Sequence, residues 1–217
     1  MVQQTQASPQ PNLPRPNAFD TAASASAGFS RIAVDVTFLR MTARPSQPTP
    51  ALPAGYDIVR VRAPTVGFYR YLYGAVGRDY CWWLRRVAGD GEIAALLADP
   101  RASLHVVYHG GEPGGFFELD GRLAGEVNIS YFGLMPHLVG RRIGTAFLRA
   151  AIDEAWRQVE AQGSPRPVGI RVNTCTADHP RALDSYLRAG FKPLRSVREI
   201  WNIPEYLGLP IPQHLRA

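Results

Sequence analysis

Residues 126–156 constrain the fold more than any other part of the sequence. An extended apolar run that ends at Leu134 leads into a short loop at 135–140, and a long pattern with helical spacing follows. A strand, a glycine-bearing turn and a helix in this order present backbone N–H groups to a phosphate. Residues 127–152 contain no Asp or Glu. We therefore expect an anion at the start of this helix.

Composition limits the possible partners of the chain. At 217 residues and 46% hydrophobic content, the chain is long enough for one domain with a sizeable core. The net charge of +6 suits an anionic ligand, but no run of basic residues exceeds a pair, so we expect no nucleic-acid partner. The two cysteines form neither a disulfide framework nor a metal-ligand cluster, and we expect no metal. We find no secretory signal or membrane span, and expect a cytoplasmic protein.

Hydrophobic periodicity predicts an alternation of strands and helices. Strands are predicted at residues 31–41, 56–62, 104–108, 115–119, 124–134, 168–174 and 191–201. Helices are predicted from Asp90 or Gly91 to Ala98, at 142–161, and at 180–190. The three strands between 104 and 134 form a meander, and the strand–helix–strand unit that follows implies a parallel crossover.

The two ends of the chain differ in composition from the segment between them. Residues 1–29 are rich in Pro, Gln, Ala and Ser, and we expect disorder there; a targeting leader is a weaker alternative. Residues 30–203 form the predicted domain, and residues 204–217, with three prolines, are predicted to be a tail.

Residues 65–86 are rich in aromatic side chains. Phe68, Tyr71 and Leu72 recur at helical spacing, and Gly77 is a reasonable helix end. One interpretation is that these rings belong to the core or to a lid over it. The other is that some of them, Trp82 and Trp83 included, line a pocket for a partly apolar acceptor.

Two separated motifs resemble the GNAT superfamily of acyl-CoA-dependent N-acetyltransferases. Residues 139–148, VGRRIGTAFL, are similar to the family's pyrophosphate loop, Q/R-x-x-G-x-G/A. Residues 178–191, DHPRALDSYLRAGF, are similar to its closing helix, in which an aromatic acid precedes x-x-x-G-F. The order of elements matches the family over roughly residues 31–201. The resemblance implies an α/β layered fold: a twisted, mixed and mostly antiparallel sheet of about seven strands, flanked by helices, with a parallel crossover after the phosphate-binding loop.

The loop departs from the family pattern at two positions. The Q/R position holds Val139, and the middle glycine is replaced by Arg142. Helix N-terminal N–H groups do not depend on side-chain type, so the anion site can survive these changes. A glycine allows backbone to approach a ligand more closely than an arginine does, although Arg141 and Arg142 can also reach phosphate oxygens directly.

The resemblance also implies a set of cofactor-binding residues. The strand end at Leu134 and Met135 pairs with the pantetheine arm through backbone groups. The pyrophosphate lies against residues of the loop and helix start: Val139, Gly140, Arg141, Arg142, Ile143, Gly144 and Thr145. His179 takes the position of a family Asn, where it either contacts the cofactor arm or caps the helix.

Transfer to an amine requires proton movements, because a lysine-like amine has a pKa of about 10.4 and attacks only when neutral. Glu126, on the strand leading into the loop, is the candidate general base, acting through water; the alternative is a structural carboxylate at a strand edge. Tyr186 is the candidate that protonates the leaving thiolate. A ping-pong route through Cys175 is disfavoured, because a small apolar thiol after a strand is commonly buried structure.

The leading hypothesis is therefore an N-acetyltransferase that moves an acetyl group directly from acetyl-CoA to a primary amine in a ternary complex. The alternative is a non-catalytic domain of the same fold that binds CoA or another anion as a sensor. The acceptor amine cannot be read from the sequence. We expect no membrane partner, and homodimers are common in the family.

Overall fold

The computed structural model describes residues 28–164 and 168–217. We expected disorder in residues 1–29, and residues 1–27 of that segment lie outside the described part of the chain. The helices and strands appear in the order β1 (Phe29–Met41), β2 (Tyr56–Val61), α1 (Val66–Gly77), α2 (Leu84–Val87), α3 (Asp90–Ala98), β3 (Ala102–His109), β4 (Glu112–Asp120), β5 (Glu126–Leu134), α4 (Gly144–Gln162), β6 (Gly169–Cys175), α5 (Ala182–Ala189) and β7 (Lys192–Pro204).

All seven strands belong to one sheet with the order β2-β3-β4-β5-β6-β1-β7. Every neighbouring pair is antiparallel except β5 and β6, which are parallel and are connected through α4. The predicted mixed, mostly antiparallel sheet with one parallel crossover is confirmed. β1 lies between β6 and β7 and not beside β2, the strand that follows it in the sequence.

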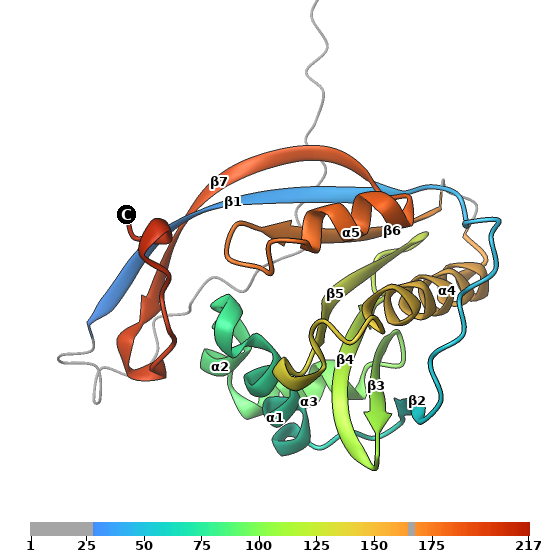
Figure 1. Cartoon of the computed structure of the whole chain (residues 1–217), viewed down its shortest axis with the longest axis horizontal. Helices are drawn as coiled ribbons and strands as arrows, with labels where there is room; N and C mark the ends of the chain where they lie inside the picture. The colour runs from blue at the N-terminus through green and yellow to red at the C-terminus, as the bar shows by residue number, and fades with distance from the viewer. Residues whose placement is uncertain (1–27, 165–167) are drawn as a thin grey trace, which may run out of the picture.

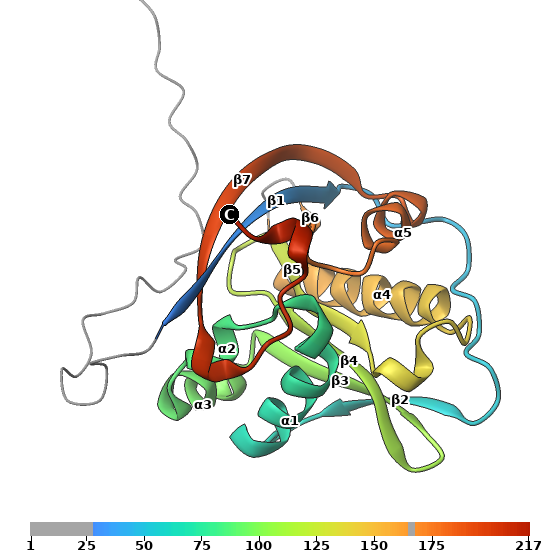
Figure 2. The same ribbon diagram turned by 60° about the vertical axis from the view of Figure 1, so that its left-hand side comes forward.

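The two faces of the sheet carry separate hydrophobic cores. On one face, α4 packs through Phe147, Ile152 and Trp156 over β5 and β6, and α5 joins the same core through Tyr186. On the other face, α1 and α3 pack through Tyr69, Leu72 and Ile93 over β3 and β4. Figures 1 and 2 show α1, α2 and α3 gathered away from α4 and α5. The site described below lies where the two layers meet, at the divergence of β5 and β6.

The predicted tail is packed against the domain. Leu215 is buried with Ile32 and Ile203 in a third core on β1 and β7, and the Arg216 backbone bridges to Ile32. Two 3-10 turns, Glu205–Leu207 and Gln213–Leu215, carry the chain back along this core. The apolar side chains between the prolines account for this packing, since each removes area from water.

No helix among the described residues is long and apolar enough to cross a membrane.

Candidate functional site

The parallel strands β5 and β6 pair over only part of their length. The pairing runs from Glu126–Gly169 to Ile129–Val172 and then stops, so that the second half of β5 has no neighbour on that side among the described strands. A row of backbone polar groups left unpaired within a sheet is a ready template for another extended chain. The opening between the two strands is therefore a candidate ligand groove.

A β-bulge explains why the strands diverge at this point. In the pairing of β4 with β5, Glu118 lies opposite Tyr131 and Leu119 opposite Ile129, which leaves Ser130 as an extra residue. A bulge bends its strand and increases the local twist. Because Ser130 follows directly after the last pair with β6, the bend carries the rest of β5 away from β6.

The start of α4 lies next to this opening. The Leu134 side chain would stand 3.9 Å from a Cβ on Gly144, so the end of β5 and the first turn of α4 are in contact range. The helix has no side-chain N-cap and no acidic residue in its first turn. Among the described residues, the N–H groups of Ile143, Gly144 and Thr145 have no hydrogen-bond acceptor. Such an N-terminus favours an anion.

The loop before α4 adds further N–H groups. Gly140 has φ +83 and Arg142 has φ +63, both in the left-handed region, and Ile143 then returns to the right-handed region at φ −84. Alternating left- and right-handed residues make a concave nest of N–H groups that binds anions. Of the predicted loop residues, Val139, Gly140, Arg141, Arg142 and Thr145 are exposed, Gly144 is partly exposed, and Ile143 is buried. Arg142 therefore takes the backbone conformation for which the family uses glycine.

Leu134 and Met135, the two residues predicted to pair with a pantetheine arm, differ in whether their backbone groups are already hydrogen-bonded. The Met135 N–H donates to the Gly114 carbonyl at 2.9 Å, and its carbonyl accepts from the Leu138 N–H at 2.9 Å. The Met135 N–H is therefore already used and its carbonyl already accepts one hydrogen bond, and the pairing of Met135 with such an arm stays a prediction. Backbone groups alternate in direction along a strand, so Leu134 and Phe132 direct theirs into the opening. Leu134 remains a candidate.

Tyr186 and Asp178 border the opening from the β6 side. Tyr186 is buried on α5 and packs edge-to-face on Phe191, and its hydroxyl has no hydrogen-bond partner within the described part of the chain. Burial raises the pKa of the Tyr186 phenol, and the Asp178 carboxylate raises it further. The phenol thus stays protonated and free to donate. Tyr186 was predicted from the sequence, whereas Asp178 was not.

Asp178 is fixed by hydrogen bonds from both sides of the opening. Its Oδ2 accepts from the Thr174 hydroxyl at 2.8 Å and from the Cys175 N–H at 2.9 Å. Its Oδ1 accepts from the Trp82 indole N–H at a long 3.4 Å. A carboxylate has about four acceptor positions, so Oδ1 can accept a further donor. The only signal in the sequence was an Asp soon after a strand end, a common turn position.

Aromatic side chains form the wall of the opening on the α1 side. Trp82 lies with its ring centroid 5.0 Å from Tyr131 and 5.4 Å from Tyr73. Tyr73 is buried in the core, whereas Trp82 is partly exposed. The core interpretation therefore holds for part of the aromatic segment, and the acceptor pocket stays a prediction. Tyr69 and Tyr73 belong to the core, and Trp82 borders the opening.

A buried ion pair lies behind this wall. Glu118, 2% exposed, accepts from the Tyr69 hydroxyl at 2.5 Å and from the Arg85 guanidinium at 3.4 Å. The Arg85 guanidinium also lies 5.7 Å from the centroid of the Tyr131 ring. Burial raises the pKa of Glu118, and Arg85 opposes that change. The pair fixes Tyr131, which is opposite Glu118 on β5.

The structure does not bring Glu126 into this site. Glu126 begins β5, eight residues before Leu134, which is roughly 26 Å along a strand. Its carboxylate is buried between Arg40, at 2.9 Å, and Arg171, at 2.5 Å. The structural alternative, a carboxylate that ties strands together, therefore describes Glu126 better than a general base does. The two arginines that hold Glu126 come from other strands and could not be predicted from its own segment.

The remaining candidates have structural partners. His179 Nδ1 accepts from the Arg181 N–H at 3.1 Å, and the His179 carbonyl accepts from the Ala182 N–H at 2.8 Å, so His179 caps the turn into α5. Its contact with a cofactor stays a prediction. Burial raises the pKa of the Cys175 thiol to about 12, which makes this thiol a poor nucleophile at neutral pH.

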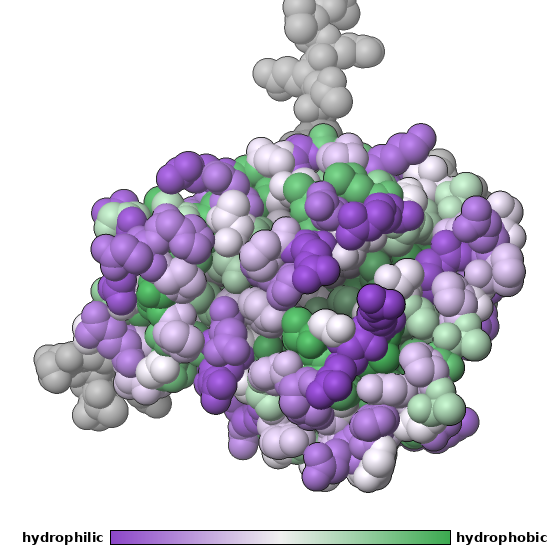
Figure 3. Space-filling view, in the orientation of Figure 1, coloured by the Kyte–Doolittle hydropathy of each residue, from purple (hydrophilic) through white to green (hydrophobic). Residues whose placement is uncertain are grey.

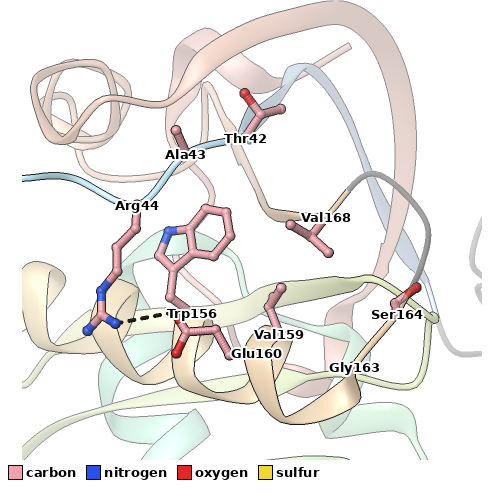
Figure 4. A pocket seen from close by; sticks show the side chains of 9 residues that line it. All are labelled: Thr42, Ala43, Arg44, Trp156, Val159, Glu160, Gly163, Ser164 and Val168. Atoms are coloured by element: carbon pink, nitrogen blue, oxygen red, sulfur yellow. Dashed lines mark hydrogen bonds and ion pairs between the residues drawn. The ribbon is translucent and has the colours of Figure 1, made fainter.

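The surface agrees with a groove at this position. Figure 3 shows a hollow with an apolar floor between α5 and the loop that precedes α4. A separate cavity of about 360 Å³ lies at the opposite end of α4, between Arg44, Trp156 and Val168 (Figure 4). None of the predicted site residues lines that cavity. Within residues 28–164 and 168–217, no group of His, Cys, Asp and Glu could hold a metal ion.

Comparisons with known proteins place the fold. No protein-family description and no curated protein sequence matches the chain. Solved structures do match. A tandem GNAT protein from the clavulanic acid biosynthesis pathway has a TM-score of 0.56 at 17% identity, covering 80% of this chain and 55% of that one. A GCN5-related N-acetyltransferase from Sphaerobacter thermophilus has a TM-score of 0.51 at 19% identity, covering 82% and 54%.

A third match, a GCN5-related N-acetyltransferase from Kribbella flavida, has a TM-score of 0.52 at 13% identity and covers 83% of this chain and 63% of that one. This chain thus spans little more than half the length of the first two. At sequence identities this low, the matches show similarity of fold alone. The seven-stranded sheet with its one parallel pair matches these structures over about four fifths of the chain. The chain therefore has the fold of the GCN5-related N-acetyltransferases.

Proposed function

We propose that the protein is an N-acetyltransferase that transfers an acetyl group from acetyl-CoA to a primary amine. The observation that carries the proposal is the convergence of three features at the opening between β5 and β6. These are unpaired backbone on Leu134, the free N–H groups of residues 142–145 at the helix start, and the free phenol of Tyr186. They suit, respectively, an extended arm, the diphosphate at one end of that arm and the leaving thiolate at the other.

The residues present fit acetyl-CoA at this position. The nest around Arg142 and the first turn of α4 would hold the diphosphate through N–H groups. Gly144 leaves open space above the first turn, since a Cβ there would meet only Leu134 at 3.9 Å. Leu134 and Phe132 would pair with the amide groups of the arm as a neighbouring strand does. Acetyl-CoA supplies the thioester from which the acetyl group is transferred.

The proton movements fall to Asp178 and Tyr186. Asp178, instead of Glu126, accepts the proton of the attacking amine, directly or through water, because its charge lies close enough to raise the pKa of both Tyr186 and Tyr131. The C–N bond forms as the C–S bond breaks. Tyr186 donates its proton to the sulfur, and both side chains return to their starting states by exchange with water. Trp82 orients the Asp178 carboxylate from across the opening.

Calorimetric titration with acetyl-CoA and with CoA tests the binding step. We expect micromolar binding by the wild type and its loss in Gly144→Trp, because the indole would fill the space over the N–H groups. Gly67→Trp is the matched control, since a side chain at Gly67 also meets open space but on α1. Absence of binding by the wild type would overturn the proposal.

Detection of the free CoA thiol with a panel of amines tests the transfer step. Tyr186→Phe and Asp178→Asn should retain acetyl-CoA binding and lower turnover about 10²-fold or more, as removal of a general acid or base does. Binding without turnover for every amine in the panel would instead favour the sensor alternative.

A further inference from the structure

Strand β7 forms an uncovered edge of the sheet. It lies at the end of the strand order and runs for 13 residues, with β1 as its only neighbour among the described strands. Figure 2 shows it as the outermost ribbon of the β6-β1-β7 half of the sheet. Every residue from Lys192 to Arg198 is exposed, and Glu199 is partly exposed. A long edge strand with unpaired N–H and C=O groups is a template for pairing with another chain.

The edge also exposes apolar side chains. Leu194 is 61% exposed, Val197 is 37% exposed and Ile200 is 46% exposed. Edges that avoid pairing usually carry charged side chains, prolines or bulges. Here Lys192, Pro193 and the bulge around Leu194 lie at one end of β7 and leave the segment from Arg195 to Glu199 regular.

Symmetry limits how two such edges can pair. Two copies related by a two-fold axis normal to the sheet pair antiparallel and keep the same face up, so one residue must lie opposite its own copy. With Val197 at the axis, Arg195 of each copy lies opposite Glu199 of the other, and Ser196 lies opposite Arg198. This register gives two opposite-charge pairs around a central apolar pair.

Registers with a charged residue at the axis are worse for electrostatic reasons. Placing Arg195, Arg198 or Glu199 at the axis would set like charges directly opposite each other, which is destabilising. Arg195 and Glu199 also share a face of β7 with Val197, because they pair with Phe38, Val34 and Val36 on β1. The Arg195 guanidinium is held on that face, 4.8 Å from the Phe38 ring centroid.

We propose that the partner of this edge is a second copy of the chain, paired antiparallel through β7 with Val197 at the two-fold axis. The two sheets then form one continuous sheet across the dimer. The opening between β5 and β6 stays accessible, because β1 and β6 separate it from β7.

The test is the mass of the full-length chain by light scattering after size exclusion, over a series of concentrations. We expect twice the chain mass of 23.9 kDa for the wild type. Arg195→Glu and Glu199→Arg should each raise the dimer dissociation constant about tenfold or more, because both symmetric pairs become repulsive. The double variant that exchanges the two charges should restore the dimer.

Lys192→Glu is the control, since it makes the same charge change on the same strand opposite the uncharged Asn202 of the second copy. Circular dichroism and thermal melting of each variant confirm folding, because Glu199 also accepts from the Trp201 indole at 2.8 Å. A wild type that stays monomeric at every concentration would overturn the proposal. So would a dimer that neither single charge reversal weakens, or one that the double exchange fails to restore.

Discussion

Arg142 offers a way to separate the backbone of the phosphate loop from its side chains. Its φ of +63 places an arginine in the left-handed region, where Cβ approaches the following carbonyl oxygen. Both Arg142→Gly and Arg142→Ala remove the guanidinium, which is exposed. Only the glycine variant also removes Cβ and its steric conflict. The two variants thus differ in backbone strain and agree in lost charge.

The size of the strain sets the expected difference in stability. A left-handed conformation costs an L-residue with a Cβ about 1 kcal/mol, and glycine adopts it without that cost but with greater freedom in the unfolded chain. We expect Arg142→Gly to be more stable than Arg142→Ala by about 0.5–1 kcal/mol, which is a few degrees in Tm at most for a chain of this size. Urea unfolding monitored by circular dichroism measures the difference directly.

Titration of the same pair with CoA completes the test. If the N–H nest carries the diphosphate, both variants keep most of the affinity and lose the same amount relative to wild type. An alanine variant as stable as the glycine variant would refute the conformation inferred for Arg142. Equal and complete loss of CoA binding in both would show that the guanidinium, and not the nest, holds the anion.

Three further outcomes follow from buried groups. Glu126→Gln should lower the free energy of unfolding by about 2 kcal/mol, because it removes the carboxylate charge that Arg40 and Arg171 both contact, yet preserve acetyl transfer; loss of activity in a folded variant would contradict this. The pKa of His105 is lowered to about 4 by burial and by nearby arginines, so stability is full above pH 6.5 and falls by about 3 kcal/mol as pH drops towards 4. His105→Leu should abolish that component in urea titrations from pH 7 to 4.5. Gly133→Ala should destabilise by about 1–3 kcal/mol, since its Cβ would clash with Val76, whereas Gly144→Ala meets no such clash; equal unfolding midpoints would contradict this.

The sequence predicted the elements well because their signals are local. Apolar alternation and helical spacing belong to each segment alone, and every predicted strand and helix exists in the structure within a few residues. The order of strands depends on partners that are distant in the chain. Nothing in the pattern of residues 31–41 indicates that β1 lies between β6 and β7.

The site was predictable to the same extent. The loop before α4 and the position of Tyr186 follow from short motifs, and the structure places both beside the opening. Glu126 was selected because it lies on the strand that leads into the loop, and that strand alone does not reveal the two arginines contributed by β1 and β6. Asp178 depends on an indole from the α1 side, and the bulge at Ser130 depends on the register with β4. Neither can be read from one segment.

The place of β1 has a consequence for how the protein is made. A ribosome releases this strand early, but its neighbours, β6 and β7, begin at Gly169 and Lys192. The β2–β5 meander can form while synthesis continues, whereas β1 must wait with both of its edges unpaired until nearly the whole chain has emerged. Such distant pairing slows folding and exposes strand edges to other nascent chains. The half of the sheet that closes the site is therefore the last to form, and chaperone demand during synthesis should be set by the first strand of the chain.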